Sequence, residues 1–194
     1  TLCGGGASIS TATLMRTGAT TSYRTGDDAN RSSEGRATSF LTLAENNPFG
    51  NTNRFTSELG TQTYTNNIVI DWSTFNGATV LGWGKTIRGG TVRDIAQNIG
   101  DALLLSIGGF TTGWRVPNVI ELISIFNYSL PASVVNYAPF SVLVSYLTTS
   151  TGASAGSQFV GLASQGTILR GSTSDQYRQY LPCRTFTVTG TILT

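Results

Sequence analysis

The segment Gly113-Trp114-Arg115-Val116-Pro117-Asn118-Val119-Ile120-Glu121-Leu122 holds the clearest structural signals in the chain. Asn118 can accept a hydrogen bond as the N-cap of a helix, and Glu121 follows at the spacing of a capping box. Pro117 stands just before the cap and fixes the start of the helix. The apolar residues that follow recur on one face of the predicted helix. The segment therefore predicts a helix that begins near Asn118.

A first helix is expected upstream, within residues 91–105. Ile95, Ile99 and Ala102 recur there at helical spacing, after a capping pattern that begins at Thr91. The glycine pair at 108–109 can end this helix, because glycine adopts the left-handed conformation of a helix C-terminus. The middle of the chain therefore carries two helices.

Strand patterns lie on both sides of these helices. Asn76 and Gly77 separate the first two patterns, as in a hairpin. The expected strands are Ile68–Trp72, Ala78–Trp83, Phe140–Leu147, Gln158–Leu162, Thr167–Arg170, Cys183–Val188 and a final edge strand over Thr189–Leu193. Because the strands and helices follow in blocks rather than in alternation, we expect an α+β fold.

The composition is typical of a protein exposed outside the cytoplasm. Only 11% of the 194 residues are charged, against about a quarter in an average domain, and 23 are glycine. Hydroxyl and amide side chains take the place of charges, as in many extracellular and virion β-rich proteins. We therefore expect a location on a virion surface, outside the cell or on a cell surface.

The residue types exclude several classes of function. The chain has no histidine, which rules out a Ser-His-Asp triad, a Cys-His pair and a histidine metal site. The net charge of +2 comes mainly from scattered arginines, so no nucleic-acid partner is expected. No run of about eighteen apolar residues occurs, so no membrane insertion is expected. We expect a protein that is not an enzyme and has no cofactor.

Two features leave alternatives open. Asp27 and Asp28 form the one adjacent acidic pair, in a turn whose oxygens suit calcium, but a solvated turn is the favoured explanation. Cys3 and Cys183 lie near opposite ends of the chain and are either free thiols or a disulfide. A disulfide closing so long a loop would stabilise the fold by roughly 4–5 kcal/mol in the chain-entropy model.

Several motifs occur in the order found in a known family. Trp-Arg-Val-Pro at 114–117, followed after three residues by Glu121-Leu122, resembles the signature of DUF1566 domains, the Lcl C-terminal type of bacterial collagen-like surface proteins. Further matches are Thr17-Gly18-Ala19-Thr20 with Gly26-Asp27-Asp28, Asn53-Arg54-Phe55-Thr56 with Asp71-Trp72, Tyr146-Leu147-Thr148-Thr149-Ser150-Thr151, and Cys183-Arg184-Thr185-Phe186. The chain departs from the family pattern at Tyr146 and Leu147, and Cys183 lacks the usual nearby cysteine.

The resemblance implies a C-type-lectin-like fold over residues 17–194, after an extended N-terminal arm at 1–16. In this fold the first and last strands pair, two helices pack on the sheet, and long loops present a binding surface. The signature residues with expected structural roles are Trp72, Trp114, Arg115, Pro117, Glu121 and Arg184. The family's sugar-binding relatives use a carboxylate before the proline of a Pro-Asn pair; Val116 stands there, so calcium-dependent sugar binding is not expected.

The resemblance implies a non-enzymatic module of a phage virion, such as a fibre, or of a bacterial cell surface. Its expected partner is a host-surface protein or glycan receptor. Residues 149–180 are rich in serine, glycine, threonine and tyrosine, a mixture that resembles antibody binding loops. The ligand-binding candidates in this region are Arg170, Asp175, Tyr177, Arg178 and Tyr180. Simple solvated loops are the alternative interpretation.

A second hypothesis is a structural subunit of a virion or an extracellular filament. The glycine-rich arm 1–16 and the β-prone tail Thr185–Thr194 could each add to the sheet edge of a neighbouring subunit. This hypothesis predicts a homo-oligomer, with a trimer as one possibility, whose partners are other virion or filament subunits.

Overall fold

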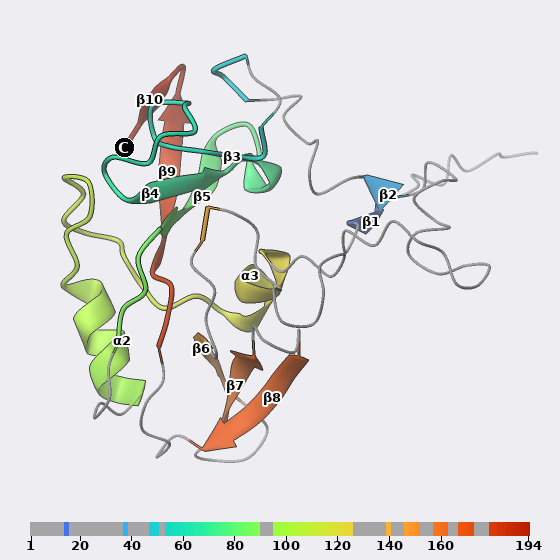
Figure 1. The fold of residues 1–194 in the computed structure, drawn as a ribbon, viewed down its shortest axis with the longest axis vertical. Helices are drawn as coiled ribbons and strands as arrows, with labels where there is room; N and C mark the ends of the chain where they lie inside the picture. Colours follow the sequence, from blue (N-terminus) through green and yellow to red (C-terminus); the bar gives the residue numbers. More distant parts are fainter. Residues whose placement is uncertain are drawn as a thin grey trace, which may run out of the picture.

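The structure is a computed structural model that describes residues 14–15, 37–38, 47–50, 53–89, 95–125, 139–140, 146–151, 157–162, 167–172 and 179–194. These parts form an α+β fold of antiparallel sheets and two short helices, as the sequence predicts (Figure 1).

A five-stranded antiparallel sheet, in the order β10-β9-β5-β4-β3, forms the centre of the protein. Its strands are β3 (Phe55–Thr56), β4 (Ile68–Asp71), β5 (Thr79–Gly84), β9 (Cys183–Thr189) and β10 (Ile192–Leu193). The register of β5 and β9 runs from Thr79 opposite Thr187 to Trp83 opposite Cys183. The C-terminal strand β9 is therefore an interior strand, paired with a strand from the first half of the chain.

Alternation along the strands gives this sheet two apolar faces. The core cluster on one face consists of Phe55, Val69, Leu81, Trp83, Leu122, Ile125, Phe140, Leu181 and Cys183. The cluster on the other face consists of Ile68, Ile70, Trp72, Val80, Ile107, Trp114, Phe186 and Leu193. Gly82 allows this second cluster to close, because a Cβ atom there would lie 2.3 Å from the ring of Phe186. The sheet is thus buried on both sides over much of its area.

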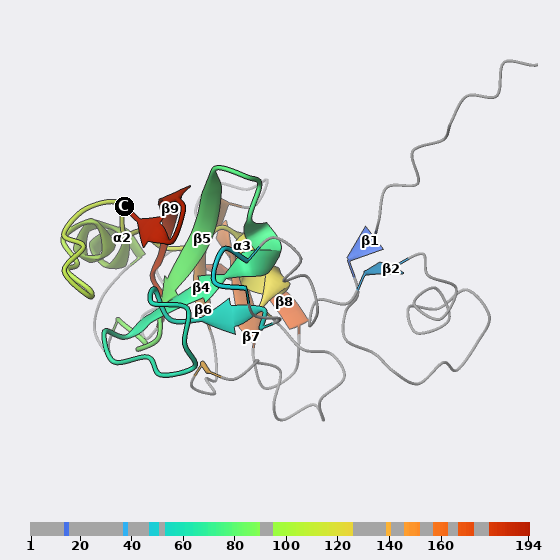
Figure 2. The same cartoon turned by 90° about the horizontal axis from the view of Figure 1, so that it is seen from above.

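The two helices pack in different places (Figure 2). α2 (Ile95–Leu103) contributes Ala102 to a third cluster with Val116 and Tyr180. α3 (Val119–Ser124) starts at the N-cap Asn118 with a complete capping box to Glu121, as the spacing predicts. The buried Leu122 of α3 attaches this helix to the first face of the sheet. The start of α3 and the helical character of both segments are therefore as predicted, while residues 90–94, which hold the capping pattern expected for the first helix, lie outside the described parts.

Two further sheets complete the described elements. β6 (Tyr146–Thr151), β7 (Ser157–Leu162) and β8 (Thr167–Ser172) form an antiparallel sheet beside α3. β1 (Leu14–Met15) and β2 (Ala37–Thr38) form a parallel pair that lies away from the other labelled elements in both views (Figures 1 and 2). Among the described strands, β1 pairs with β2 and β10 pairs with β9. The pairing of first and last strands that the resemblance implies is not found there.

Three sequence-based expectations need correction. The first predicted strand ends at Asp71 rather than Trp72, because the Asp71 side chain caps a 3-10 helix, η1, over Trp72–Thr74. β4 and β5 pair antiparallel as the hairpin signal predicts, but their connection is longer than a two-residue turn, because η1 precedes Asn76-Gly77 within it. The tail Thr185–Thr194 is not a free arm, because β9 pairs on both sides within its own sheet.

Candidate functional site

Arg115, Glu121 and Cys183 meet where the start of α3 approaches β9. The guanidinium of Arg115 donates to both carboxylate oxygens of Glu121, at 2.6 and 2.8 Å, and to Cys183 Sγ at 3.1 Å. The backbone groups of Arg115 and Cys183 exchange two hydrogen bonds of 2.9 Å. Glu121 also accepts from the N–H of Asn118 at 2.8 Å. These contacts hold the loop before α3 against the last long strand.

The electrostatics of this cluster favour its charged pair. Burial raises the pKa of Glu121, but the Arg115 hydrogen bonds and the Asn118 N–H outweigh burial, and the net pKa is lowered. The hydrogen bond to Glu121 raises the pKa of Arg115, so the guanidinium stays protonated. Burial raises the pKa of the Cys183 thiol. The thiol is therefore a neutral, poorly nucleophilic group rather than a reactive one.

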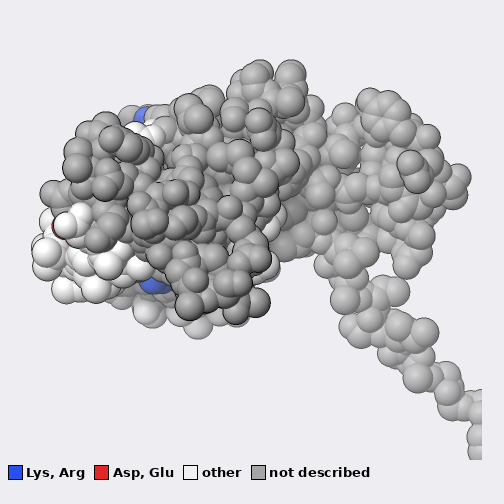
Figure 3. Space-filling view, turned by 90° about the horizontal axis from the view of Figure 1, so that it is seen from below, with Lys and Arg blue, Asp and Glu red and all other residues white. Residues whose placement is uncertain are grey.

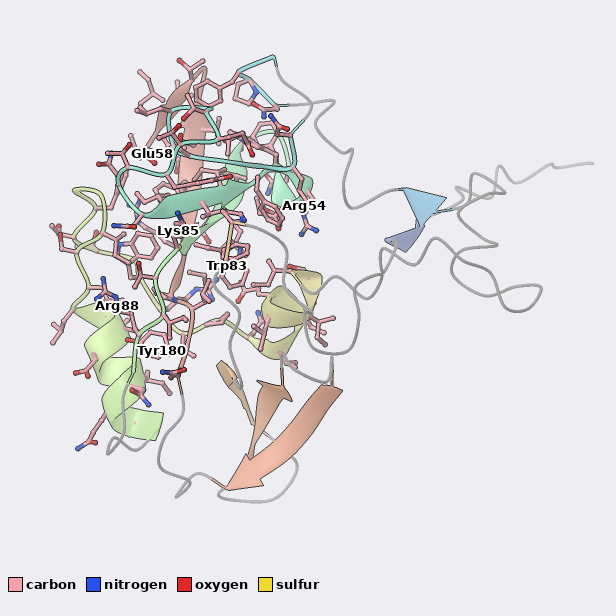
Figure 4. The ribbon with its side chains drawn as sticks, viewed as in Figure 1. Arg54, Glu58, Trp83, Lys85, Arg88 and Tyr180 are labelled. Atoms are coloured by element: carbon pink, nitrogen blue, oxygen red, sulfur yellow. The ribbon has the colours of Figure 1, made fainter. Side chains whose placement is uncertain are left out.

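A second ion pair, Arg54–Asp71, lies in the interior, with side chains 2% and 0% exposed. Arg54 donates to both carboxylate oxygens, at 2.7 and 2.8 Å, and to the carbonyl of Ser124 at 2.9 Å. Figure 4 shows Arg54 pointing from the β3 side of the sheet toward α3. Asp71 also accepts from the N–H and hydroxyl of Ser73. The pair therefore joins β3, β4, η1 and the end of α3.

Arg54 and Asp71 occur among the motif matches in the sequence, where no contact between them was expected. One signal was present: Asp71 ends the fully buried strand Ile68–Asp71, where an acidic group needs a partner. The identity of that partner depends on the pairing of β3 with β4, which puts Phe55, the neighbour of Arg54, opposite Asp71.

The other signature residues also have structural contacts. Trp114 is 0% exposed and donates from its ring nitrogen to the carbonyl of Phe110 at 2.8 Å. Trp72 is 3% exposed and bonds to the hydroxyl of Thr56. Pro117 is buried just before the cap of α3. Arg184 lies over the rings of Phe110 and Phe186, at 4.6 and 4.5 Å from their centroids, and donates to Thr112 O. These side chains act as supports of the core.

The structure places one ligand-binding candidate in the core. Tyr180 is only 1% exposed and packs with Ala102 and Val116, beside α2 in Figure 4. Its ring is therefore not a surface anchor, which corrects the sequence-based assignment. Arg170 lies on β8, and its side chain is outside the described parts. Asp175, Tyr177 and Arg178 lie wholly outside them.

The sequence left open a disulfide between Cys3 and Cys183 and a calcium site at Asp27 and Asp28. Cys183 is a free, fully buried thiol, so the structure contains no disulfide at this position; Cys3 lies outside the described residues. The calcium candidates Asp27 and Asp28 also lie outside them. Among the described residues, no group of three or more acidic, cysteine or histidine side chains is placed to hold a metal ion.

The described surface carries little charge. On the face drawn in Figure 3, the described residues are mostly uncharged, with a few isolated basic side chains among them. Two described ion pairs, Arg54–Asp71 and Arg115–Glu121, join different elements of the fold. The described ion pairs therefore stabilise the fold.

No family model, curated protein or solved structure matches this chain. The helices that the structure describes include none with the length and apolar character needed to cross a membrane.

Proposed function

We propose that the chain is a non-enzymatic binding module with a C-type-lectin-like fold, presented on a phage virion or a bacterial cell surface. Its proposed partner is a host-surface protein or glycan receptor. The proposal combines the ordered motif resemblance, the low charge of the sequence and the scaffold role of the signature residues. It does not depend on calcium, since the sequence lacks the carboxylate that calcium-dependent sugar binding requires.

One observation carries the proposal: the candidate segment after β8 is rooted in a rigid scaffold. At its C-terminal side, the backbone of Tyr180 exchanges two hydrogen bonds of 2.9 Å with Arg88, while the Tyr180 ring is locked in the core. At its N-terminal side, Arg170 lies on β8, which is fully paired with β7. Binding residues commonly lie on loops held by such supports. The described residues on both sides of positions 173–178 are therefore held by backbone pairing.

The test measures binding by the whole chain. Fluorescently labelled protein is titrated onto a panel of intact bacterial cells and onto an array of purified bacterial surface polysaccharides. We expect saturable binding to one class of surface, weakened at least tenfold by Arg178→Ala or by Arg170→Ala. Arg88→Ala is the matched control: it removes an exposed arginine at the root of the segment, and only the backbone of Arg88 has the contacts described above.

The outcomes separate the possibilities. Binding that both candidate variants lose and the control retains supports the proposed surface. Binding that all three variants retain moves the surface elsewhere and contradicts the assignment of residues 170–178. No saturable binding to any cell or polysaccharide contradicts the receptor-binding function itself. Thermal unfolding of each variant separates lost recognition from lost folding.

A further inference from the structure

The two edges of the central sheet differ. The edge strand β3 is covered by the segment that follows it: the side chains of Gln62 and Tyr64 both donate to the carbonyl of Phe55. The opposite edge strand, β10, pairs with β9 on one side and with no described strand on the other. Figure 1 shows β10 beside β9 at the end of the sheet. Among the residues that the structure describes, one edge is therefore blocked and the other is unpaired.

The hydrogen-bond pattern shows which groups of β10 face this open edge. Thr194 and Thr187 exchange two backbone hydrogen bonds, at 2.9 and 3.1 Å, so they form a bonded pair. Leu193 is opposite Val188, whose N–H donates to Ala78 O on the β5 side. In an antiparallel ladder bonded and non-bonded pairs alternate, so the N–H and C=O of Leu193 point away from β9.

The side chains around this edge do not oppose self-association. Residues 185–194 contain no charged residue and no proline, the two devices that most often protect an exposed edge. The side chain of Ile192 is 63% exposed beside the edge. No charged side chain of residues 185–194 therefore opposes the approach of two copies, and each copy can bury an apolar side chain against the other.

We propose that β10 is the surface through which two copies of this chain associate, by antiparallel pairing about a two-fold axis at Leu193. The N–H of Leu193 donates to the C=O of the partner's Leu193, and the reverse bond completes the pair. Ile192 then lies opposite the partner's Thr194, and the two five-stranded sheets join into one. A two-fold contact of this kind is self-complementary, because each copy supplies the same residues.

The strand is short, which sets the strength of the contact. Two backbone hydrogen bonds and one apolar side chain per copy bury far less than the roughly 1,000 Å² of a stable interface. The association is therefore weak and dependent on concentration for the free protein, and it strengthens where many copies are displayed together. It is independent of the receptor-binding surface proposed above, so either proposal can fail alone.

Sedimentation equilibrium of the whole chain, from micromolar to millimolar concentration, tests this surface with two matched pairs of variants. Leu193→Pro removes the outward N–H and keeps the Thr194 N–H that pairs with Thr187, while Leu193→Ala loses a similar side chain but keeps the N–H. Ile192→Lys places two like charges at the proposed axis. The control for Ile192→Lys is Leu104→Lys, which places a lysine at a different exposed apolar residue, 82% exposed, just after the end of α2.

We expect a reversible rise in mass from monomer to dimer for the wild type, Leu193→Ala and Leu104→Lys. We expect the dissociation constant to rise at least tenfold for Leu193→Pro and Ile192→Lys. A wild type that stays monomeric up to millimolar concentration overturns the proposal. So does a dimer that Leu193→Pro weakens no more than Leu193→Ala does. Circular dichroism spectra of all four variants confirm that each one is folded.

Discussion

The buried Arg54–Asp71 pair gives a prediction whose size follows from its surroundings. Asp71 and Arg54 have side chains 0% and 2% exposed, so removing one partner leaves a charge in the interior. Breaking such a pair costs about 3–5 kcal/mol, much of it the penalty of the unpaired group. Asp71 also caps η1 through Ser73, and losing a cap costs about 1 kcal/mol more. We therefore expect Asp71→Leu to be at least as damaging as Arg54→Met.

The double variant Arg54→Met with Asp71→Leu separates the pair from its neighbours. With both charges replaced by apolar groups, the interior contains no unpaired ion, so the double variant loses less stability than the sum of the single variants. We expect a coupling energy of at least about 2 kcal/mol from urea unfolding of the four proteins. The corresponding cycle at Arg115 and Glu121, 37% and 19% exposed, should give only about 1 kcal/mol.

Two results would refute this reasoning. If Asp71→Leu costs less than about 1 kcal/mol, the pair is not buried as the structure describes. If the single-variant losses simply add, the two side chains do not depend on each other for their burial. An equal coupling energy in both cycles would show that burial does not set the strength of these pairs.

Three further predictions concern the core and the Arg115 cluster. Gly82→Ala should destabilise the protein by about 1–3 kcal/mol, because the new methyl group overpacks against an aromatic ring of β9. Gly100→Ala lies in α2, where an added Cβ atom meets nothing within 4 Å, so it should stabilise the protein by about 0.5–1 kcal/mol. Thermal unfolding of the two variants measures both effects. The pKa of Glu121 is lowered in the folded state, so its contribution to stability is complete above its unfolded pKa of about 4.3 and is lost as pH falls through the folded pKa. Urea titrations from pH 2 to 7 should therefore show a smaller loss of stability at acid pH for Glu121→Gln than for the wild type. An unchanged loss of stability at acid pH would count against this assignment. Because burial raises its pKa, the Cys183 thiol should resist a thiol-specific reagent in the folded Cys3→Ser protein and react fully in urea; rapid reaction in the native state would contradict its burial.

The parts of the fold that the sequence predicted are those with local signals. The capping box of α3 depends on two residues three positions apart, and the apolar strand at Ile68 depends on neighbours in the chain. Arg115 and Glu121 were expected to have structural roles, and the structure pairs them with each other. The α+β class followed from the order of such local patterns.

The misses come from contacts outside the patterns that suggested the assignments. Tyr180 was read as a surface anchor because its neighbours in the sequence are polar, but the Arg88 bridge turns its ring toward Ala102 and Val116. The end of the first strand shifted because Asp71 bonds forward to Ser73, which starts η1 one residue early. In both cases the deciding partner lies outside the pattern that suggested the assignment.

The same distinction explains how the proposed binding role could coexist with the buried core of this chain. The motif residues Arg54, Asp71, Trp114, Arg115 and Glu121 are engaged in ion pairs, caps or core packing, so changing them alters stability first. Substitutions in a recognition surface on residues 170–178 would instead leave those contacts intact, provided that the pairing of Tyr180 and of β8 is kept. Loss of binding without loss of stability should therefore map to that segment, and loss of both should map to the motif residues. A variant scan that found binding lost only together with stability would show that scaffold and recognition surface are not separate.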